Sequence, residues 1–218
     1  MPATSVVATA AGRFRKTPQL RVETSQRRYV PCVGDEVVAV ITERLGGELY
    51  RVDMGAAAGA LLPALAFAGA TKRNRPHLHA GDVVYARVVQ VPTERRQCDG
   101  ELSCTAPGSN KSWVTGECPF GPLCGGTLFA VSPTLTRRLR QRPCAVLEEL
   151  GRQVAFEIAI GINGRVWVDS DAAPVTILVR NAILASERMD RRQTARLVRA
   201  LLKATAPLLP TRTIQGVR

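Results

Sequence analysis

Five short β-like segments between residues 37 and 104 constrain the fold more than any other feature of this sequence. They are rich in Val, Ile and Tyr and cover residues 37–41, 48–54, 60–62, 83–91 and 101–104. Turn residues lie between them: Gly46-Gly47, Gly55, Gly59, Gly81-Asp82 and Asp99-Gly100. Short strands joined by such turns, with one longer connection, predict a small OB-type β-barrel.

The charge of the chain predicts an anionic partner. Thirty Lys and Arg against eighteen Asp and Glu give a formal net charge of +12, so nucleic acid is the first candidate. The excess is uneven, because residues 34–107 hold nine acids and eight cations whereas residues 108–218 hold eight and sixteen. A barrel in the first region would bind nucleic acid through local groups of cations. The chain lacks the roughly eighteen consecutive apolar residues of a membrane span, so we expect no membrane partner.

One such group of cations lies in the long connection of the predicted barrel. Residues 69–76 read Gly-Ala-Thr-Lys-Arg-Asn-Arg-Pro. A charge run of this kind is often only solvated surface, yet three cations on a short loop also suit phosphate oxygens. We predict RNA contacts from this loop and from a second pair of arginines: Lys72, Arg73, Asn74, Arg75, Arg95 and Arg96.

The C-terminal part mixes helices and strands. The pattern predicts a strand over 127–132, two helices beginning at Pro133 and Pro143, strands over 153–160 and 165–169, and a helix over 174–188. Asp190 and Gln193 have the spacing of a capping box for a last helix that runs to Lys203. The order β-α-α-β-β-α is that of a KH fold.

Gly161-Ile162-Asn163-Gly164 joins the last two predicted strands. Asn-Gly between apolar runs is a strong hairpin signal, and we expect positive φ at both Asn163 and Gly164. The GxxG loop with which other KH domains clamp nucleic acid joins two helices. The turn of this chain joins two strands, so we interpret it as structural.

These patterns predict an α+β multidomain chain. Residues 1–28 form an N-terminal segment with short strands near Leu20 and Val22, and residues 29–107 form the OB barrel. Residues 108–126 form a connection rich in Gly, Pro, Ser and Cys, and residues 127–218 form the KH-type domain.

The six cysteines give a weak metal signal. Cys98/Cys104 and Cys118/Cys124 share a five-residue gap, whereas zinc ligands usually lie two to four residues apart. We therefore predict no metal and no other cofactor, and we expect free thiols because no secretory signal is evident.

Several of these stretches resemble one family, the RNA exosome cap subunits that combine an S-one domain of the OB type with a KH domain. Arg28-Tyr29-Val30-Pro31 with Gly34-Asp35 resembles the start of the family's S-one domain. Gly161-Ile162-Asn163-Gly164 and the following Arg165-Val166-Trp167-Val168 resemble its GxNG motif and next strand. The octapeptide resembles the loop signature of the type represented by ribosomal RNA-processing protein 40. The match covers about residues 12 to 203.

The resemblance implies a non-catalytic RNA-binding cap subunit of a 3′→5′ exoribonuclease complex. Such a subunit helps to guide RNA into the complex and to stabilise its ring. The implied partners are RNase-PH-like ring subunits, the other cap subunits and single-stranded RNA. The implied localisation is the nucleus and nucleolus, and also the cytoplasm. Gly161, Asn163 and Gly164 would then form a structural turn buried between the two domains.

Two alternatives remain open at the level of the sequence. The chain could be a stand-alone OB/KH RNA-binding protein in translation or RNA maturation. It could also be a nuclease, but the barrel acids Asp35, Glu36, Asp53 and Asp82 show no two-metal pattern, and we predict no catalytic residue. With only 5% aromatic residues, and Tyr50, Phe67 and Tyr85 as candidate stacking platforms, the chain alone should bind RNA weakly and mostly by charge.

Overall fold

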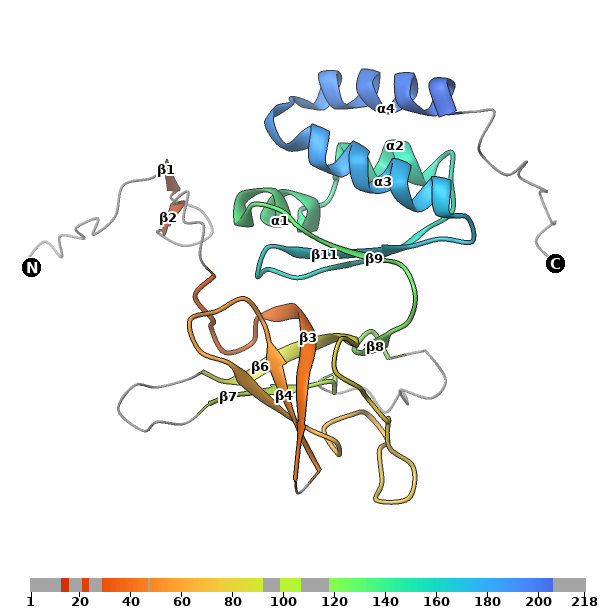
Figure 1. Ribbon diagram of the computed structural model, residues 1–218. Coiled ribbons are helices and arrows are strands. Elements are labelled where there is room, and N and C mark those ends of the chain that lie inside the picture. Colours follow the sequence, from red (N-terminus) through yellow and green to blue (C-terminus); the bar gives the residue numbers. More distant parts are fainter. Residues whose placement is uncertain are drawn as a thin grey trace, which may run out of the picture.

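The computed structural model describes residues 29–46, 48–91, 99–106 and 118–205, together with the backbone of two short N-terminal strands. These strands, β1 (Arg13–Arg15) and β2 (Arg21–Glu23), pair antiparallel. The rest of the described chain forms a β-barrel and a sheet covered by helices, which lie one against the other in Figure 1.

The barrel consists of five strands in the order β3-β4-β5-β7-β6, closed by pairing of β3 with β6. Their bounds are β3 (Glu36–Leu45), β4 (Leu49–Asp53), β5 (Ala60–Pro63), β6 (Val83–Gln90) and β7 (Gly100–Ser103). Along β4, Tyr50 and Val52 are buried while Arg51 and Asp53 are exposed, so the strand turns alternate side chains into the core. The predicted OB-type barrel is therefore confirmed.

A sixth strand, β8 (Gly121–Leu123), lies in the stretch that the sequence assigns to a connection. It pairs with Val83, Val84 and Tyr85 of β6, beyond the residues of β6 that pair with β7. The connection is thus partly built into the barrel sheet, and it leads directly into the second domain.

The KH-type domain has a three-stranded antiparallel sheet in the order β10-β11-β9. Its elements are β9 (Thr127–Ala130), α1 (Pro133–Arg140), α2 (Ala145–Gly151), β10 (Glu157–Ile160), β11 (Arg165–Asp169), α3 (Ala173–Ala185), the 3₁₀ turn η1 (Ser186–Arg188) and α4 (Arg191–Thr205). The elements from β9 to α3 have the predicted β-α-α-β-β-α order, and α4 is the predicted last helix. The capping box is also confirmed, because Gln193 N donates to Asp190 Oδ1 at 2.7 Å and Asp190 N donates to Gln193 Oε1 at 3.0 Å.

Both faces of this sheet are covered. The helices lie on one face and the barrel lies on the other (Figure 1). Val166 and Val168 pack into the helical core, whereas Ala159 and Trp167 form a small apolar contact with Val38 of β3. Successive side chains of β11 therefore pack alternately against the helices and against the barrel, and this contact fixes the barrel against the KH sheet. No helix in the described part of the chain is both long and apolar enough to cross a membrane.

Candidate nucleic-acid interface

The octapeptide forms a tight turn between β5 and β6. Thr71 N donates to Asn74 O at 2.8 Å, and Asn74 N donates back to Thr71 O at 3.2 Å. This closed turn leaves the side chains of Lys72, Arg73 and Asn74 exposed. Within the described residues neither Lys72 nor Arg73 takes part in an ion pair, so both cations are available to an anionic ligand.

Buried groups fix the two ends of this loop to the barrel. Tyr50 donates its hydroxyl to Pro76 O at 3.0 Å and accepts from Leu78 N at 3.4 Å, and Ala70 N donates to Phe67 O at 2.9 Å. Tyr50 and Phe67 therefore belong to the core and are not stacking platforms for bases. Tyr85 packs its ring on Phe120 and donates its hydroxyl to Glu36, so it too has a structural task.

Arg75 differs from the other two cations of the loop. Its side chain is only 21% exposed and forms an ion pair with Glu48, which lies in the turn between β3 and β4. The contact with Arg75 holds the pKa of the Glu48 carboxyl below its usual range, and the charges of Lys72 and Arg44 act in the same direction. The second predicted group, Arg95 and Arg96, lies outside the described residues.

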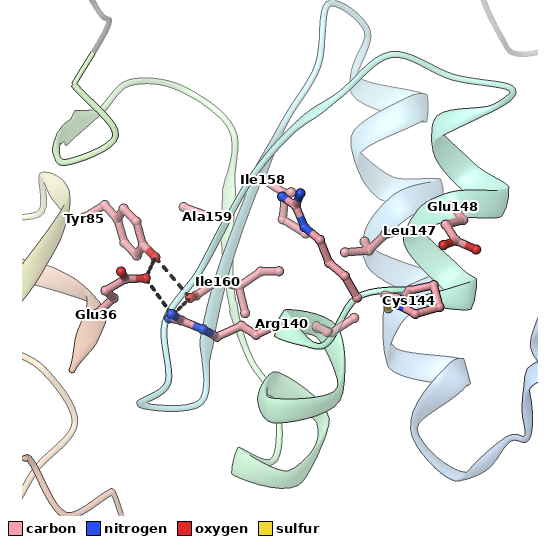
Figure 2. A pocket seen from close by; sticks show the side chains of 12 residues that line it. Glu36, Tyr85, Arg140, Cys144, Leu147, Glu148, Ile158, Ala159 and Ile160 are labelled. Atoms are coloured by element: carbon pink, nitrogen blue, oxygen red, sulfur yellow. Dashed lines mark hydrogen bonds and ion pairs between the residues drawn. The ribbon is translucent and has the colours of Figure 1, made fainter. Parts of the chain in front are cut away.

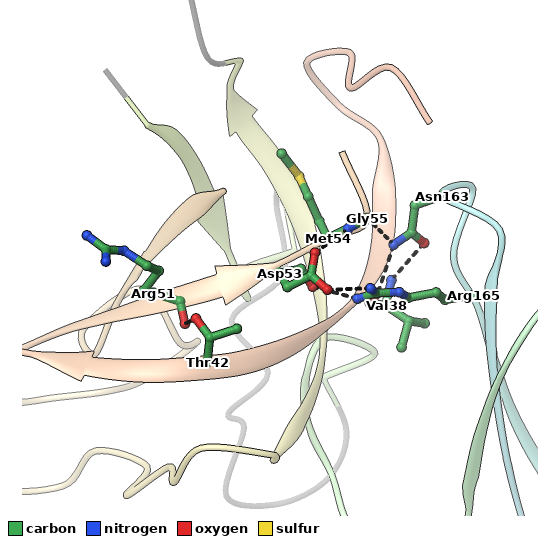
Figure 3. Close-up of polar contacts among 8 residues, drawn as sticks. All are labelled: Val38, Thr42, Arg51, Asp53, Met54, Gly55, Asn163 and Arg165. Carbon is green, nitrogen blue, oxygen red and sulfur yellow. Dashed lines mark hydrogen bonds and ion pairs between the residues drawn. The ribbon is translucent and has the colours of Figure 1, made fainter. Parts of the chain in front are cut away.

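The turn at 161–164 lies against the barrel at the point where β3 and β4 separate. These strands pair from Leu45/Leu49 to Val40/Asp53, and beyond that point the chain turns away at Met54 and Gly55. The Asn163 carboxamide bonds to Val38 of β3 and to Met54, the residue that follows β4, as Figure 3 shows. Its Nδ2 donates to Val38 O and to Met54 O, each at 2.8 Å, and its Oδ1 accepts from Val38 N at 3.3 Å.

The conformation of this turn corrects one prediction. Gly164 has a φ of 80°, as predicted, but Asn163 is not among the residues with positive φ. The reason is that Gly161 N donates to Arg165 O and Gly164 N donates to Gly161 O, which makes a three-residue loop. In such a loop a type I turn precedes a single left-handed residue. Asn163 is thus required here for its hydrogen bonds and not for its backbone angle.

Gly161 is also fixed by close contacts. A Cβ atom at this position would lie 2.2 Å from Asn163 Oδ1 and 2.5 Å from Val38 N. Next to it, Ile162 N donates to Glu36 O at 2.9 Å. Only glycine lets the hairpin backbone approach β3 closely enough for the carboxamide to reach it.

Two arginines of the KH domain extend this contact to barrel acids. Arg165 donates from Nη1 to Asp53 O and from Nη2 to Asp53 Oδ2, both at 2.6 Å (Figure 3). Burial raises the pKa of the Asp53 carboxyl, but hydrogen bonds from Arg165 and from Gly55 N outweigh it, so that the pKa lies below its usual value. The domains are thereby joined by a charge-assisted pair next to the Asn163 contact.

Arg140 forms the second of these pairs. Its Nη2 donates to Glu36 Oε2 at 2.6 Å, and Tyr85 donates its hydroxyl to the same oxygen at 2.9 Å (Figure 2). Burial, and then the charge of Glu36, raise the pKa of the Tyr85 hydroxyl. These three residues line one part of a cavity of about 770 Å³ between the barrel, the end of α1, the start of α2 and β10.

Four acids of the barrel have structural partners. Glu36 and Asp53 bind KH arginines, Asp35 accepts from Tyr29 and from Cys32 N, and Asp82 accepts from His79 N. Within the described ranges no group of three or more His, Cys, Asp or Glu side chains is arranged to hold a metal ion. The exposed cations Lys72 and Arg73 suit binding of phosphates.

The cysteine pairs of the sequence do not form a common cluster in the described residues. Cys104 is buried in the barrel core, and burial raises the pKa of its thiol. Cys118 Sγ donates to Cys104 O at 3.7 Å, whereas Cys124 is exposed. Cys98 lies outside the described residues.

Sequence reasoning missed the residues that join the domains through charge. The sequence analysis considered Glu36 and Asp53 only as possible catalytic acids, and it assigned no contact to Arg140 or Arg165. Their partners lie 104 and 112 positions away, so no local spacing could have revealed them. The one usable signal was an arginine directly after the Asn163-Gly164 turn.

Comparison with known proteins places this geometry in a family. A family model described as exosome complex component RRP40, S1 domain, matches residues 29–116, and a KH domain model matches residues 126–174. A crystal structure described as an exosome complex RNA-binding protein has a TM-score of 0.60 and 18% identity. The match covers 81% of this chain and 98% of that chain, and it shows the shared fold.

Relatives support the same assignment over most of the chain. The exosome complex component RRP40 of Drosophila melanogaster is 38% identical over 186 residues, which cover 84% of this chain and 76% of the relative. The exosome complex component rrp40 of Schizosaccharomyces pombe is 35% identical over 200 residues, which cover 91% of this chain and 80% of the relative. This chain therefore belongs to the RRP40 family of exosome complex components.

Proposed function

We propose that the chain is a non-catalytic, RNA-binding cap subunit of the RNA exosome that helps to guide RNA into the complex and to stabilise its ring. The observation that carries this proposal is membership of the RRP40 family over both domains, since the relatives are named as exosome components. The exposed Lys72 and Arg73 supply a surface suited to phosphate.

The mode of RNA binding follows from the side chains at the loop. Two unpaired cations and an exposed amide can bind phosphate oxygens and riboses, which carry no base information. The aromatic residues near the loop are part of the core, so stacking adds little. The chain alone therefore binds RNA weakly, and useful affinity arises when neighbouring subunits hold the same strand.

The absence of catalysis is a second part of the proposal. Four acids of the barrel, Asp35, Glu36, Asp53 and Asp82, are bound to Arg, Tyr or backbone partners, and the described residues hold no group of three or more His, Cys, Asp or Glu side chains that could bind a metal ion for hydrolysis. The purified chain, incubated with 5′-labelled RNA and Mg²⁺ or Mn²⁺, should leave the RNA intact. Shortening that survives repurification and is lost on Asp53→Asn or Glu36→Gln would contradict the proposal.

Assembly is tested by purification of the tagged chain from cells. The expected outcome is a stoichiometric complex with RNase-PH-like ring subunits and the other cap subunits. Recovery of the chain alone, or with translation factors only, would favour a stand-alone OB/KH RNA-binding protein. We also propose localisation to the nucleus and nucleolus with a cytoplasmic fraction, which imaging of the tagged chain at its native expression level tests.

A further inference from the structure

The ion pair between Glu48 and Arg75 is the feature of the basic loop that phosphate binding alone does not explain. An acid beside an RNA-binding loop repels phosphate, yet Glu48 lies directly against it. The Nη1 atom of Arg75 is shielded from solvent and meets the Glu48 carboxylate as an ion pair, without the angles of a regular hydrogen bond. A phosphate oxygen has no access to that atom.

The backbone conformation at Glu48 fixes where its side chain leaves the turn. Its φ of 69° is the one positive value at a non-glycine residue in the described part of the chain. Glutamate avoids this conformation, which glycine adopts without cost. Glu48 O also accepts from Ala64 N at 2.8 Å, so the turn that carries the carboxylate is bonded to the end of β5. The last residue of a three-residue hairpin loop is left-handed, and Glu48 has this place between the paired Leu45 and Leu49, so the turn fixes the point from which its side chain starts.

We propose that Glu48 is the positioning residue of the basic loop. It binds Arg75 and thereby holds Lys72 and Arg73 where they meet RNA phosphates, while Arg75 makes no phosphate contact. The inference rests on the proposed RNA-binding function. It divides the three cations of the octapeptide into two ligand-binding residues and one anchor.

The charges around the loop support this division. The Glu48 carboxylate forms its ion pair with Arg75, and this contact, followed by the charge of Lys72, lowers the pKa of the carboxyl, so it stays ionised. Lys72 and Arg73 are exposed at the tip of the Thr71–Asn74 turn, whereas Arg75 is 21% exposed at its base. Because Glu48 neutralises the charge of Arg75, the loop presents a net charge of two, from Lys72 and Arg73 at its tip.

The test is whether RNA affinity rises or falls when Glu48 is removed, because its two possible effects change affinity in opposite directions. If Glu48 only repels RNA, Glu48→Ala raises the affinity of the full chain for a fluorescent twelve-residue oligouridylate. If it positions the loop, the same variant lowers affinity roughly threefold or more. The matched control is Glu43→Ala, which removes an acid of the same hairpin that is paired with Arg51 at 3.2 Å. This control should leave affinity unchanged or raise it.

Two further variants separate positioning from loss of folding. Glu48→Gln keeps the size of the side chain and an oxygen beside Arg75 but removes the charge, so it should retain more affinity than Glu48→Ala. The exchanged pair Glu48→Arg/Arg75→Glu should recover affinity relative to Arg75→Glu alone. If Glu48→Ala binds as tightly as the control, or Arg75→Ala flattens the slope of log affinity against log salt by about 0.7, the inference is wrong.

The proposed function has its own readout in the same assay. Lys72→Ala/Arg73→Ala should flatten the salt slope by about 1.4, since each single-strand phosphate contact contributes about 0.7. If that double variant leaves slope and affinity unchanged, RNA binding by the loop fails as a whole. If it flattens the slope while Glu48→Ala increases affinity, only the positioning role of Glu48 fails.

Discussion

The loop at 69–76 and the turn at 161–164 use similar residues for opposite purposes. Each contains glycine and asparagine, and each joins two strands. Asn74 is exposed at the tip of its loop, whereas Asn163 is buried and bonds to Val38 and Met54 of the other domain. The difference shows that residue types in a motif do not decide between a ligand surface and an internal joint. What decides is whether the facing domain presents backbone groups that need a partner, as Val38 and Met54 do opposite Asn163.

Replacement of the two asparagines should give the largest contrast in stability. Asn163→Leu leaves Val38 N, Val38 O and Met54 O buried without their partner. Each such group costs about 1–3 kcal/mol, so we expect a loss of about 3 kcal/mol or more in the free energy of unfolding. Asn74→Leu, at the exposed site, should change it by less than about 0.5 kcal/mol. Urea denaturation followed by circular dichroism measures both, and equal effects would contradict the contrast.

A methyl group in the turn should have a smaller but clear effect. Gly161→Ala places Cβ against Asn163 Oδ1 and Val38 N, and overpacking of this kind costs about 1–3 kcal/mol. Gly46→Ala is the control, because nothing lies within 4 Å of the Cβ that it adds. Thermal melting should show a lower midpoint for Gly161→Ala alone. A normal midpoint for that variant would mean that the hairpin can move away from β3.

The loss of folding stability at acid pH tests the charge-assisted pair of Arg165 and Asp53 next to the turn. Because the pKa of Asp53 is lowered in the folded state, its contribution is present above its unfolded pKa of about 3.9 and is lost as pH falls through the lower folded pKa. Asp53→Asn should therefore cost up to about 1 kcal/mol at pH 7, since the carboxylate is half exposed. The variant should also lose less stability than the native chain between pH 5 and pH 2. Parallel acid limbs in urea denaturation would show that the pair contributes nothing.

The loop cations should have the smallest effect on folding. Lys72→Ala/Arg73→Ala removes two exposed side chains without ion-pair partners in the described structure, so we expect less than about 0.5 kcal/mol of change in stability. The loss of RNA affinity should be similar for oligoadenylate and oligouridylate, because phosphate contacts carry no base information. A loss confined to one of the two RNAs would indicate base recognition by the loop.

Local patterns were enough to predict most of the fold. Runs of Val and Ile between glycines predicted β3 to β7, and Asp190 with Gln193 predicted the start of α4. Strand β8 was missed because Gly121-Pro122-Leu123 has little strand preference of its own and is defined by its pairing with β6. Context over many residues overrides local preference at such places.

The site was less predictable than the fold. The basic loop could be found from composition, but the separation of Arg75 from Lys72 and Arg73 depends on Glu48, 27 positions earlier in the chain. The turn could be identified as structural from the elements it joins. The family resemblance placed Asn163 between the two domains, but its hydrogen bonds could not be predicted, because its partners Val38 and Met54 lie 125 and 109 positions away.

The carboxamide of Asn163 acts as a surrogate peptide group. It gives Val38 one acceptor and one donor, as a residue of a neighbouring strand would, where β4 has left β3. All three of its bonds go to main-chain atoms, which every amino acid at positions 38 and 54 would present, except that proline lacks the N–H. The specificity of this joint is therefore encoded in one domain only. Side chains on the barrel face can change without altering the hydrogen bonds that orient the KH domain.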